Sequence, residues 1–195
     1  DPDGNIYISD GYRNSRVAKF DKDGHWVASW GERGSEPGQF RLPHGIAADA
    51  DGNVYVADRS NSRIQVLDSD GNFLRQITLN VPPPAGYVAN IPDFGRRPDG
   101  TYTSLWLNTL CITPPPNQVI YSHDMFPGRV HKMSLESEVL GHFGTTGRKL
   151  GQFGWIHALG CVSENELWVG ELLNWRAQKL TLHPERQAAI SSSGR

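Results

Sequence analysis

The 195-residue chain lacks the features that would place it among membrane proteins or proteins that coat nucleic acids. Its 19 lysines and arginines are balanced by 21 acidic residues, so it has no strongly basic surface for a phosphate backbone. No apolar run approaches the roughly 18 residues of a membrane-spanning helix, and no signal-peptide pattern opens the chain. We therefore expect neither nucleic acid nor a membrane among its partners.

Cysteine is scarce, because the chain has only Cys111 and Cys161. Two cysteines so far apart follow no metal-ligand spacing. Burial statistics favour small buried thiols, whereas a single disulfide would be expected if the protein is exported. The sequence leaves these two alternatives open.

Glycine and proline are abundant, with 21 and 13 residues, which disfavours long helices. Four segments repeat one pattern: an alternating apolar strand, an acid, a short turn, an arginine and a second apolar strand. They are 7–16, 55–63, 120–129 and 167–176, with acids Asp10, Asp58, Asp124 and Glu171 and arginines Arg16, Arg63, Arg129 and Arg176. Repeats of about 40 to 50 residues with four short strands each are typical of propeller blades. We therefore predict an all-β fold, a β-propeller of four-stranded blades, in which the acid–arginine pairs are structural.

The turns agree with this fold. Segments 1–5, 21–25, 49–53 and 68–72 each place Asp-Gly between apolar runs, and Asp-Gly supplies the positive φ that tight hairpins need. A calcium-binding EF-hand loop would need its glycine later and a glutamate downstream. We therefore expect turns at these positions.

The second repeat gives the template for a blade, with strands expected at 44–48, 53–57, 63–67 and 73–78. The chain then forms one domain of four blades, approximately 1–36, 37–80, 81–147 and 148–195. The first blade lacks its innermost strand, and 187–195 is a poor candidate for the outermost strand of the last. The third blade contains a long loop at 81–109. We expect part of a larger ring, or a ring closed by pairing of the first and last blades, as in a homo-oligomer.

A second repeated block points to the channel. Gly38, Gln39 and Phe40 precede His44 just as Gly151, Gln152 and Phe153 precede His157. Both histidines open the innermost strand of their blade, which lines the central channel of a propeller. They are therefore expected to converge on one axis.

These blocks resemble NHL-repeat β-propellers and, more closely, the peptidyl-α-hydroxyglycine α-amidating lyase family with its bacterial relatives. The resemblance covers nearly the whole chain and is carried by residues 9–12, 14–16, 37–40, 43–44, 56–59, 155–157 and 173–176. It implies a six-bladed ring, of which about four blades are present. It also favours a secreted or periplasmic protein.

The resemblance implies a zinc-dependent lyase that cleaves a peptide ending in α-hydroxyglycine to the peptide amide and glyoxylate. In the family, three channel histidines bind zinc, a tyrosine is the general base and an arginine receives the substrate carboxylate. By position, His44 and His157 match two of the zinc ligands. Tyr12 matches the catalytic tyrosine, and Arg59 matches the arginine.

Two departures from the family bear on the activity. The third zinc histidine belongs to an earlier blade, and Ala158 stands where the family has an aspartate that serves calcium. The resemblance therefore implies zinc, argues against calcium, and leaves the lyase impaired or incomplete. The alternative function is a non-catalytic NHL scaffold that binds a protein or peptide. A lactonase-type hydrolase is disfavoured, because the innermost strands lack the channel carboxylates and asparagines that bind calcium there.

Each candidate also has a structural alternative. His44 and His157 would then satisfy backbone groups, Tyr12 would be a turn residue, and Arg59 would pair with Asp58 or Asp10. Among the remaining histidines, His123, beside Asp124, is an additional candidate ligand, whereas His131 and His142 are expected at the surface. The six tryptophans are expected between blades, where large rings suit the packing of sheet on sheet: Trp26, Trp30, Trp106, Trp155, Trp168 and Trp175.

Overall fold

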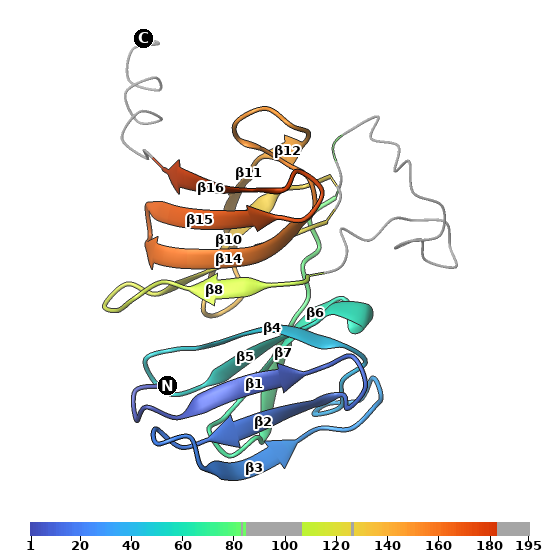
Figure 1. Cartoon of the computed structure of the whole chain (residues 1–195), viewed down its shortest axis with the longest axis vertical. Coiled ribbons are helices and arrows are strands. Elements are labelled where there is room, and N and C mark those ends of the chain that lie inside the picture. Colours follow the sequence, from blue (N-terminus) through green and yellow to red (C-terminus); the bar gives the residue numbers. More distant parts are fainter. Residues whose placement is uncertain (83, 85–106, 126, 183–195) are drawn as a thin grey trace.

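Antiparallel sheets follow one another along the chain in the computed structural model, which describes residues 1–82, 84, 107–125 and 127–182 (Figure 1). The first sheet contains β1 (Ile6–Asp10), β2 (Arg16–Phe20) and β3 (Trp26–Trp30), and the second contains β4 (Pro43–Ala48), β5 (Val54–Asp58), β6 (Arg63–Leu67) and β7 (Phe73–Ile77). The third contains β8 (Leu110–Ile112), β9 (Val119–His123), β10 (Val130–Ser134) and β11 (Val139–Phe143). The fourth contains β14 (Ile156–Ser163), β15 (Glu166–Glu171) and β16 (Arg176–Thr181). A 3-10 helix, η1 (Arg59–Asn61), and a parallel pair, β12 (Thr145–Thr146) with β13 (Gln152–Phe153), complete the described elements.

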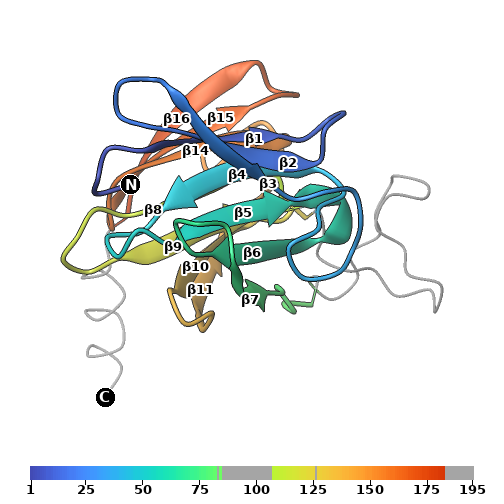
Figure 2. The ribbon, with the colours of Figure 1, turned by 90° about the horizontal axis from the view of Figure 1, so that it is seen from below.

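The expected all-β propeller fold is confirmed. Strands β4 to β7 lie within one residue of the template positions and pair in chain order, and Figure 2 shows this sheet running outward from β4 to β7. Strand β4 contacts β1 on one side and β8 on the other, and β8 also contacts β14. The strands that open the second, third and fourth sheets therefore lie next to one another, as the inner strands of successive blades do.

Within the described residues, the first and fourth sheets have three strands each, whereas the second and third have four. Most of the expected loop at 81–109, and the segment 187–195, lie outside the described residues. No helix in the described part of the chain is long and apolar enough to span a membrane.

The Asp-Gly segments form the expected turns. Gly4, Gly24, Gly52 and Gly71 have φ between +84° and +86°, a conformation that glycine adopts without steric cost. In the turn before β5, the Asp49 carboxylate accepts hydrogen bonds from the backbone N–H groups of Asp51 and Asn53, at 3.0 and 2.8 Å. Asp1, Asp21 and Asp68 make the same pair of bonds in their turns.

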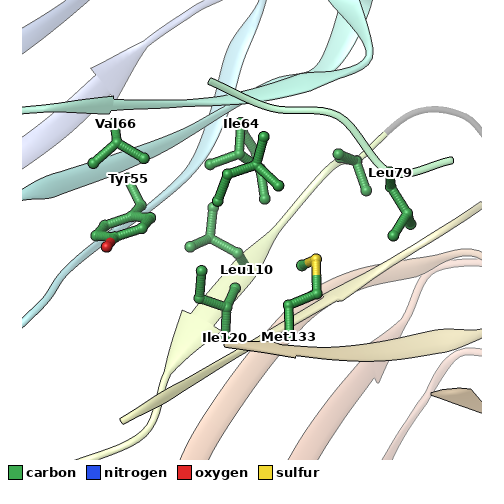
Figure 3. Close-up of a cluster of buried hydrophobic side chains, with 10 residues drawn as sticks. Tyr55, Ile64, Val66, Leu79, Leu110, Ile120 and Met133 are labelled. Carbon is green, nitrogen blue, oxygen red and sulfur yellow. The ribbon is translucent and has the colours of Figure 1, made fainter. Parts of the chain in front are cut away.

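Apolar side chains fill the space between successive sheets. The first and second sheets enclose a cluster around Val17, Phe40 and Val56. The second and third enclose the cluster drawn in Figure 3, which includes Tyr55, Ile64, Val66, Leu79, Leu110, Ile120 and Met133. The third and fourth enclose a cluster around Tyr121, Phe153, Ile156 and Leu167. Each buried large side chain contributes about 1.5–3 kcal/mol relative to an exposed one, so these clusters bind each sheet to the next.

The repeated acid–arginine pair has a structural role, as expected, and the structure shows what it holds. Arg63 Nε donates to Asp58 at 3.2 Å, with both side chains buried. The same guanidinium donates to the backbone carbonyls of Glu36 and Gln39, at 3.0 and 2.8 Å. Because these carbonyls belong to the segment that enters β4, the pair ties the connection between two sheets to β5 and β6.

The pattern recurs in the later sheets. Arg129 binds Asp124 and the carbonyls of Val81 and Pro82. Arg176 binds Glu171 and the carbonyls that precede β14 in the chain, those of Arg148, Lys149 and Gln152. In the first sheet, Arg16 and Asp10 pair at 2.9 Å with 44% and 33% of their side chains exposed.

The two cysteines do not remain as thiols. Cys111 on β8 and Cys161 on β14 form a disulfide with 5.7 Å between their Cα atoms. The expectation of buried free thiols is therefore wrong, because β8 and β14 lie side by side and bring two residues 50 positions apart together. The bond joins the third blade to the fourth beside the channel.

Two other expectations also need correction. His131 is fully buried rather than at the surface, and its Nε2 lies 2.9 Å from the Asp124 carboxylate, while His142 is exposed as expected. Trp26, Trp168 and Trp175 are exposed rather than enclosed between blades, whereas Trp30 packs against the first cluster. Trp106 lies outside the described residues.

Replacing Asp58 tests the buried Asp58–Arg63 pair and its bonds to the incoming connection, which we call the clamp. Asp58→Ala should lower the free energy of unfolding by about 3–5 kcal/mol, because Arg63 keeps a buried charge without its partner. Asp10→Ala removes the equivalent but exposed acid and should change stability little. Urea denaturation compares the two variants, and equal losses would show that the clamp is not what stabilises the fold.

The disulfide should stabilise the fold by closing a long loop. The double variant Cys111→Ala/Cys161→Ala should lose about 2–4 kcal/mol in the free energy of unfolding. Denaturation with and without reductant measures this loss. Reductant should destabilise the native protein by a similar amount and leave the double variant unaffected; a native protein insensitive to reductant would contradict the prediction.

Candidate functional site

Both channel histidines sit where the β-ladder is interrupted. On β4, Pro43 pairs with Asp58 and Ile46 pairs with Val56, so two residues, His44 and Gly45, face a single residue of β5. On β14, the pairing passes from Ile156 to Ala158 and leaves His157 as the extra residue. A β-bulge re-aims the side chain at its position. Each histidine thus leaves the regular ladder at the start of its inner strand.

The two imidazoles meet although they come from the second and fourth sheets. Their ring centroids are 5.0 Å apart and the ring planes are inclined by 78°. Zn–N bonds of about 2.0–2.1 Å in a tetrahedral site would hold two imidazole centroids roughly 5 Å apart. The separation of His44 and His157 therefore fits two ligands of one zinc ion.

The surroundings of His44 favour the form that binds a metal. Burial, followed by electrostatic repulsion from His157 and Arg59, lowers the pKa of His44, and its hydrogen bond to the Asn108 backbone partly opposes this. A neutral imidazole is the form that ligates a cation. The Asn108 carbonyl also accepts the Gly45 N–H at 2.8 Å. A backbone carbonyl of this kind orients many metal-ligating histidines.

Tyr12 reaches the same place from the first sheet. It lies in the turn between β1 and β2, the residue is 74% exposed, and its ring centroid is 6.1 Å from that of His44. Gly11 allows this approach, because a Cβ at Gly11 would lie 1.9 Å from the Pro43 carbonyl oxygen. The turn is therefore pressed against the residue that precedes His44.

Arg59 completes the group from the turn between β5 and β6. Its guanidinium interacts with the Tyr12 side chain, and it lies 5.6 Å from the centroid of the Trp155 ring. Burial lowers the pKa of Arg59, although interactions with Tyr12 oppose this, and a guanidinium remains cationic at neutral pH. The acids proposed as alternative partners are themselves paired, Asp10 with Arg16 and Asp58 with Arg63.

The structure thus gathers the four residues singled out from the sequence, Tyr12, His44, Arg59 and His157, from three sheets. It adds two that sequence reasoning assigned elsewhere or missed. Trp155 was assigned to packing between blades, but it has φ +58° and faces Arg59. Asn108 supplies the carbonyl that binds His44, and it falls in the segment assigned to a long loop. Nothing in the repeat pattern marks a backbone carbonyl. The side chain of Ala158, next to His157, is a methyl group and offers no carboxylate for calcium.

Comparison with known proteins agrees with this architecture. Residues 40–67 match the family model of the NHL repeat. The WD40 β-propeller domain of Doa1 has a TM-score of 0.58 and 12% sequence identity, over 94% of this chain and 49% of that domain; at this identity the likeness shows the fold alone. The chain therefore has a β-propeller fold and contains a match to the NHL repeat at residues 40–67.

Two relatives of this chain carry amidating functions in their names. It is 45% identical over 80 residues to Peptidyl-glycine alpha-amidating monooxygenase A of Xenopus laevis, covering 38% of this chain and 9% of the relative. It is 34% identical over 99 residues to the Probable peptidyl-alpha-hydroxyglycine alpha-amidating lyase pgal-1 of Caenorhabditis elegans, covering 48% of this chain and 26% of the relative. The matched segments span only a small part of these relatives.

The approach of Tyr12 to His44 depends on Gly11. Gly11→Ala should lower the free energy of unfolding by about 1–3 kcal/mol, because the added methyl group collides with backbone, and it should move the Tyr12 ring away from His44. Gly141→Ala is the matched control, since no atom lies within 4 Å of a Cβ there. Urea denaturation and NMR cross-peaks between the two rings measure both effects. Retained cross-peaks at full stability would contradict the prediction.

Proposed function

We propose that this NHL propeller carries the site of a zinc-dependent lyase that cleaves peptidyl-α-hydroxyglycine to the peptide amide and glyoxylate. The observation that carries the proposal is the convergence of Tyr12, His44, Arg59 and His157, residues matched separately to the family's site, at one position in the fold. The sequence similarity to amidating enzymes supports the same reaction class.

In this proposal, His44 and His157 hold the metal. When bound, zinc would polarise an oxygen of the substrate as a Lewis acid. Arg59 is placed to bind the substrate carboxylate, because a guanidinium offers two parallel donors to a carboxylate. Its contact with the Trp155 ring restrains the guanidinium.

Tyr12 supplies the proton transfer. Arg59 lies beside Tyr12, and the phenolic oxygen of Tyr12 accepts the α-hydroxyl proton as general base. The electron pair left on the substrate's α-hydroxyl oxygen forms the aldehyde C=O of glyoxylate as the carbon–nitrogen bond breaks. The proton then passes to the departing nitrogen, which leaves as the peptide amide, so atoms and charge balance.

The disulfide supports the proposed setting of the protein. Disulfides such as Cys111–Cys161 persist in oxidising compartments and are rare in the cytosol. A secreted or periplasmic location therefore accords with the amidating-lyase proposal.

A non-catalytic scaffold is the second candidate, and one observation favours it. The turn between β15 and β16 exposes Leu172, Leu173 and Trp175, the last 91% exposed. Exposed apolar side chains that gather in one place mark protein-binding surfaces. In this alternative, the turn would bind a protein or peptide.

The assay is incubation of the protein with a peptidyl-α-hydroxyglycine and zinc, followed by measurement of glyoxylate. We expect zinc-dependent release that is lost in His44→Ala and falls about 100-fold or more in Tyr12→Phe. Arg59→Met should raise KM, because the carboxylate loses its partner. Arg13→Met, an exposed arginine in the same turn as Tyr12, is the control and should behave like the native protein. Zinc binding without glyoxylate release would refute the lyase proposal and leave the scaffold.

A further inference from the structure

The turn between β15 and β16 holds apolar side chains in solvent on a fixed backbone. Leu172, Leu173 and Trp175 are 44%, 52% and 91% exposed. The Asn174 side chain donates to the Glu171 carboxylate at 2.5 Å, and the Leu173 N–H is bonded to the segment that enters β14. Apolar side chains that gather on a surface mark a place where something else covers them.

The same turn carries polar residues of the proposed site in two other sheets. Tyr12, Arg59 and Leu172 occupy one position of the turn, two residues before an asparagine whose side chain donates to the acid of its sheet. From this position, Tyr12 reaches the ring of His44 and Arg59 reaches Tyr12. Leu172 therefore takes, in the fourth sheet, the position from which the first and second sheets supply the site.

A backbone hydrogen bond repeats this correspondence. The Arg59 N–H donates to the Leu42 carbonyl at 3.0 Å, and the Leu172 N–H donates to the Trp155 carbonyl at 2.9 Å. In both blades the accepting residue lies two positions before the channel histidine. The Trp155 ring in turn lies against the Arg59 guanidinium. Leu172 is thus bonded to a residue that contacts the arginine of the site.

The two turns have the same backbone form but opposite chemical character. Residues 59–62 read Arg-Ser-Asn-Ser and residues 172–175 read Leu-Leu-Asn-Trp. The last residue of each turn, Ser62 or Trp175, has φ +53°. Three polar side chains of the second sheet are therefore replaced by apolar ones in the fourth. The second sheet offers a charge to the site, and the fourth offers apolar surface.

We propose that Leu172, Leu173 and Trp175 form an apolar subsite for the side chain of the residue that precedes hydroxyglycine in the peptide substrate. This inference rests on the lyase of the proposed function, in which Arg59 binds the terminal carboxylate. Successive Cα atoms are about 3.8 Å apart, so the preceding residue lies at the edge of the same site. Peptides with a large apolar residue there are the expected substrates, because binding removes that side chain from water.

Binding of peptides that cannot react tests the subsite independently of turnover. N-acetyl-Phe-Gly and N-acetyl-Ala-Gly carry the terminal carboxylate but no α-hydroxyl group. NMR titrations in the presence of Zn²⁺ should show about 10-fold tighter binding of the phenylalanine peptide, and Leu172→Ser/Leu173→Ser should abolish the difference. Leu74→Ser is the matched control, because Leu74 is 49% exposed on β7, at the far edge of the second sheet from β4, and it should leave the preference unchanged.

The outcomes separate the subsite from the lyase. Equal binding of the two peptides, binding of neither, or a preference that survives in the double variant would overturn the subsite. A preference that depends on the two leucines, without glyoxylate release from hydroxyglycine peptides, would support the subsite and refute the lyase. If the double variant does not fold, Leu173→Ser alone makes the comparison, because Leu173 is the more exposed of the two leucines.

Discussion

The buried acid–arginine pair is the interaction on which the rest of the structure depends. A buried charge is tolerated only when its hydrogen-bonding groups are satisfied. Asp58 meets this requirement by accepting from Arg63, from Asn61 and from the backbone N–H groups of Arg41 and Leu42. Arg63 meets it by binding carbonyls of the incoming connection. The charges of the pair can thus be buried only if the segment that connects two blades is held against the hairpin that carries the acid and the arginine. The local motif therefore also fixes how one blade packs against the next.

Repeated contacts to the same connecting segments also position the channel histidines. In the second blade, Gln65 binds the Gln39 carbonyl and the Gly38 N–H, and the next residue in the chain, Phe40, is fully buried. In the fourth blade, Gln178 binds the Gln152 carbonyl and Gly151 N–H, and Phe153 is buried in the same way. Each connection then enters an inner strand through a bulge. His44 and His157 are thus positioned by the same repeated contacts in two different blades. Their rings meet although the second and fourth sheets do not need to contact each other directly.

Much of the fold could be predicted because its signals are local. Strand alternation, Asp-Gly turns and the acid–arginine repeat act over a few residues, so the strands of the second blade fell within one residue of their predicted positions. The errors concern features set by neighbouring sheets. His131 lies on β10, the third of the four strands of its sheet, and is enclosed with Asp124. Trp26 and Trp168 lie on the first and fourth sheets, where they are exposed.

The sequence by itself determined the blade pattern, the turns and the register of His44 and His157, since each follows from residues close together in the chain. Only the tertiary structure decided that Cys111 and Cys161 pair, that the Asn108 carbonyl binds His44, and that Trp155 faces Arg59. It also decided that His123 is buried without a partner. These contacts join residues of different blades, and their distances depend on how whole sheets pack around the channel, which no local pattern encodes.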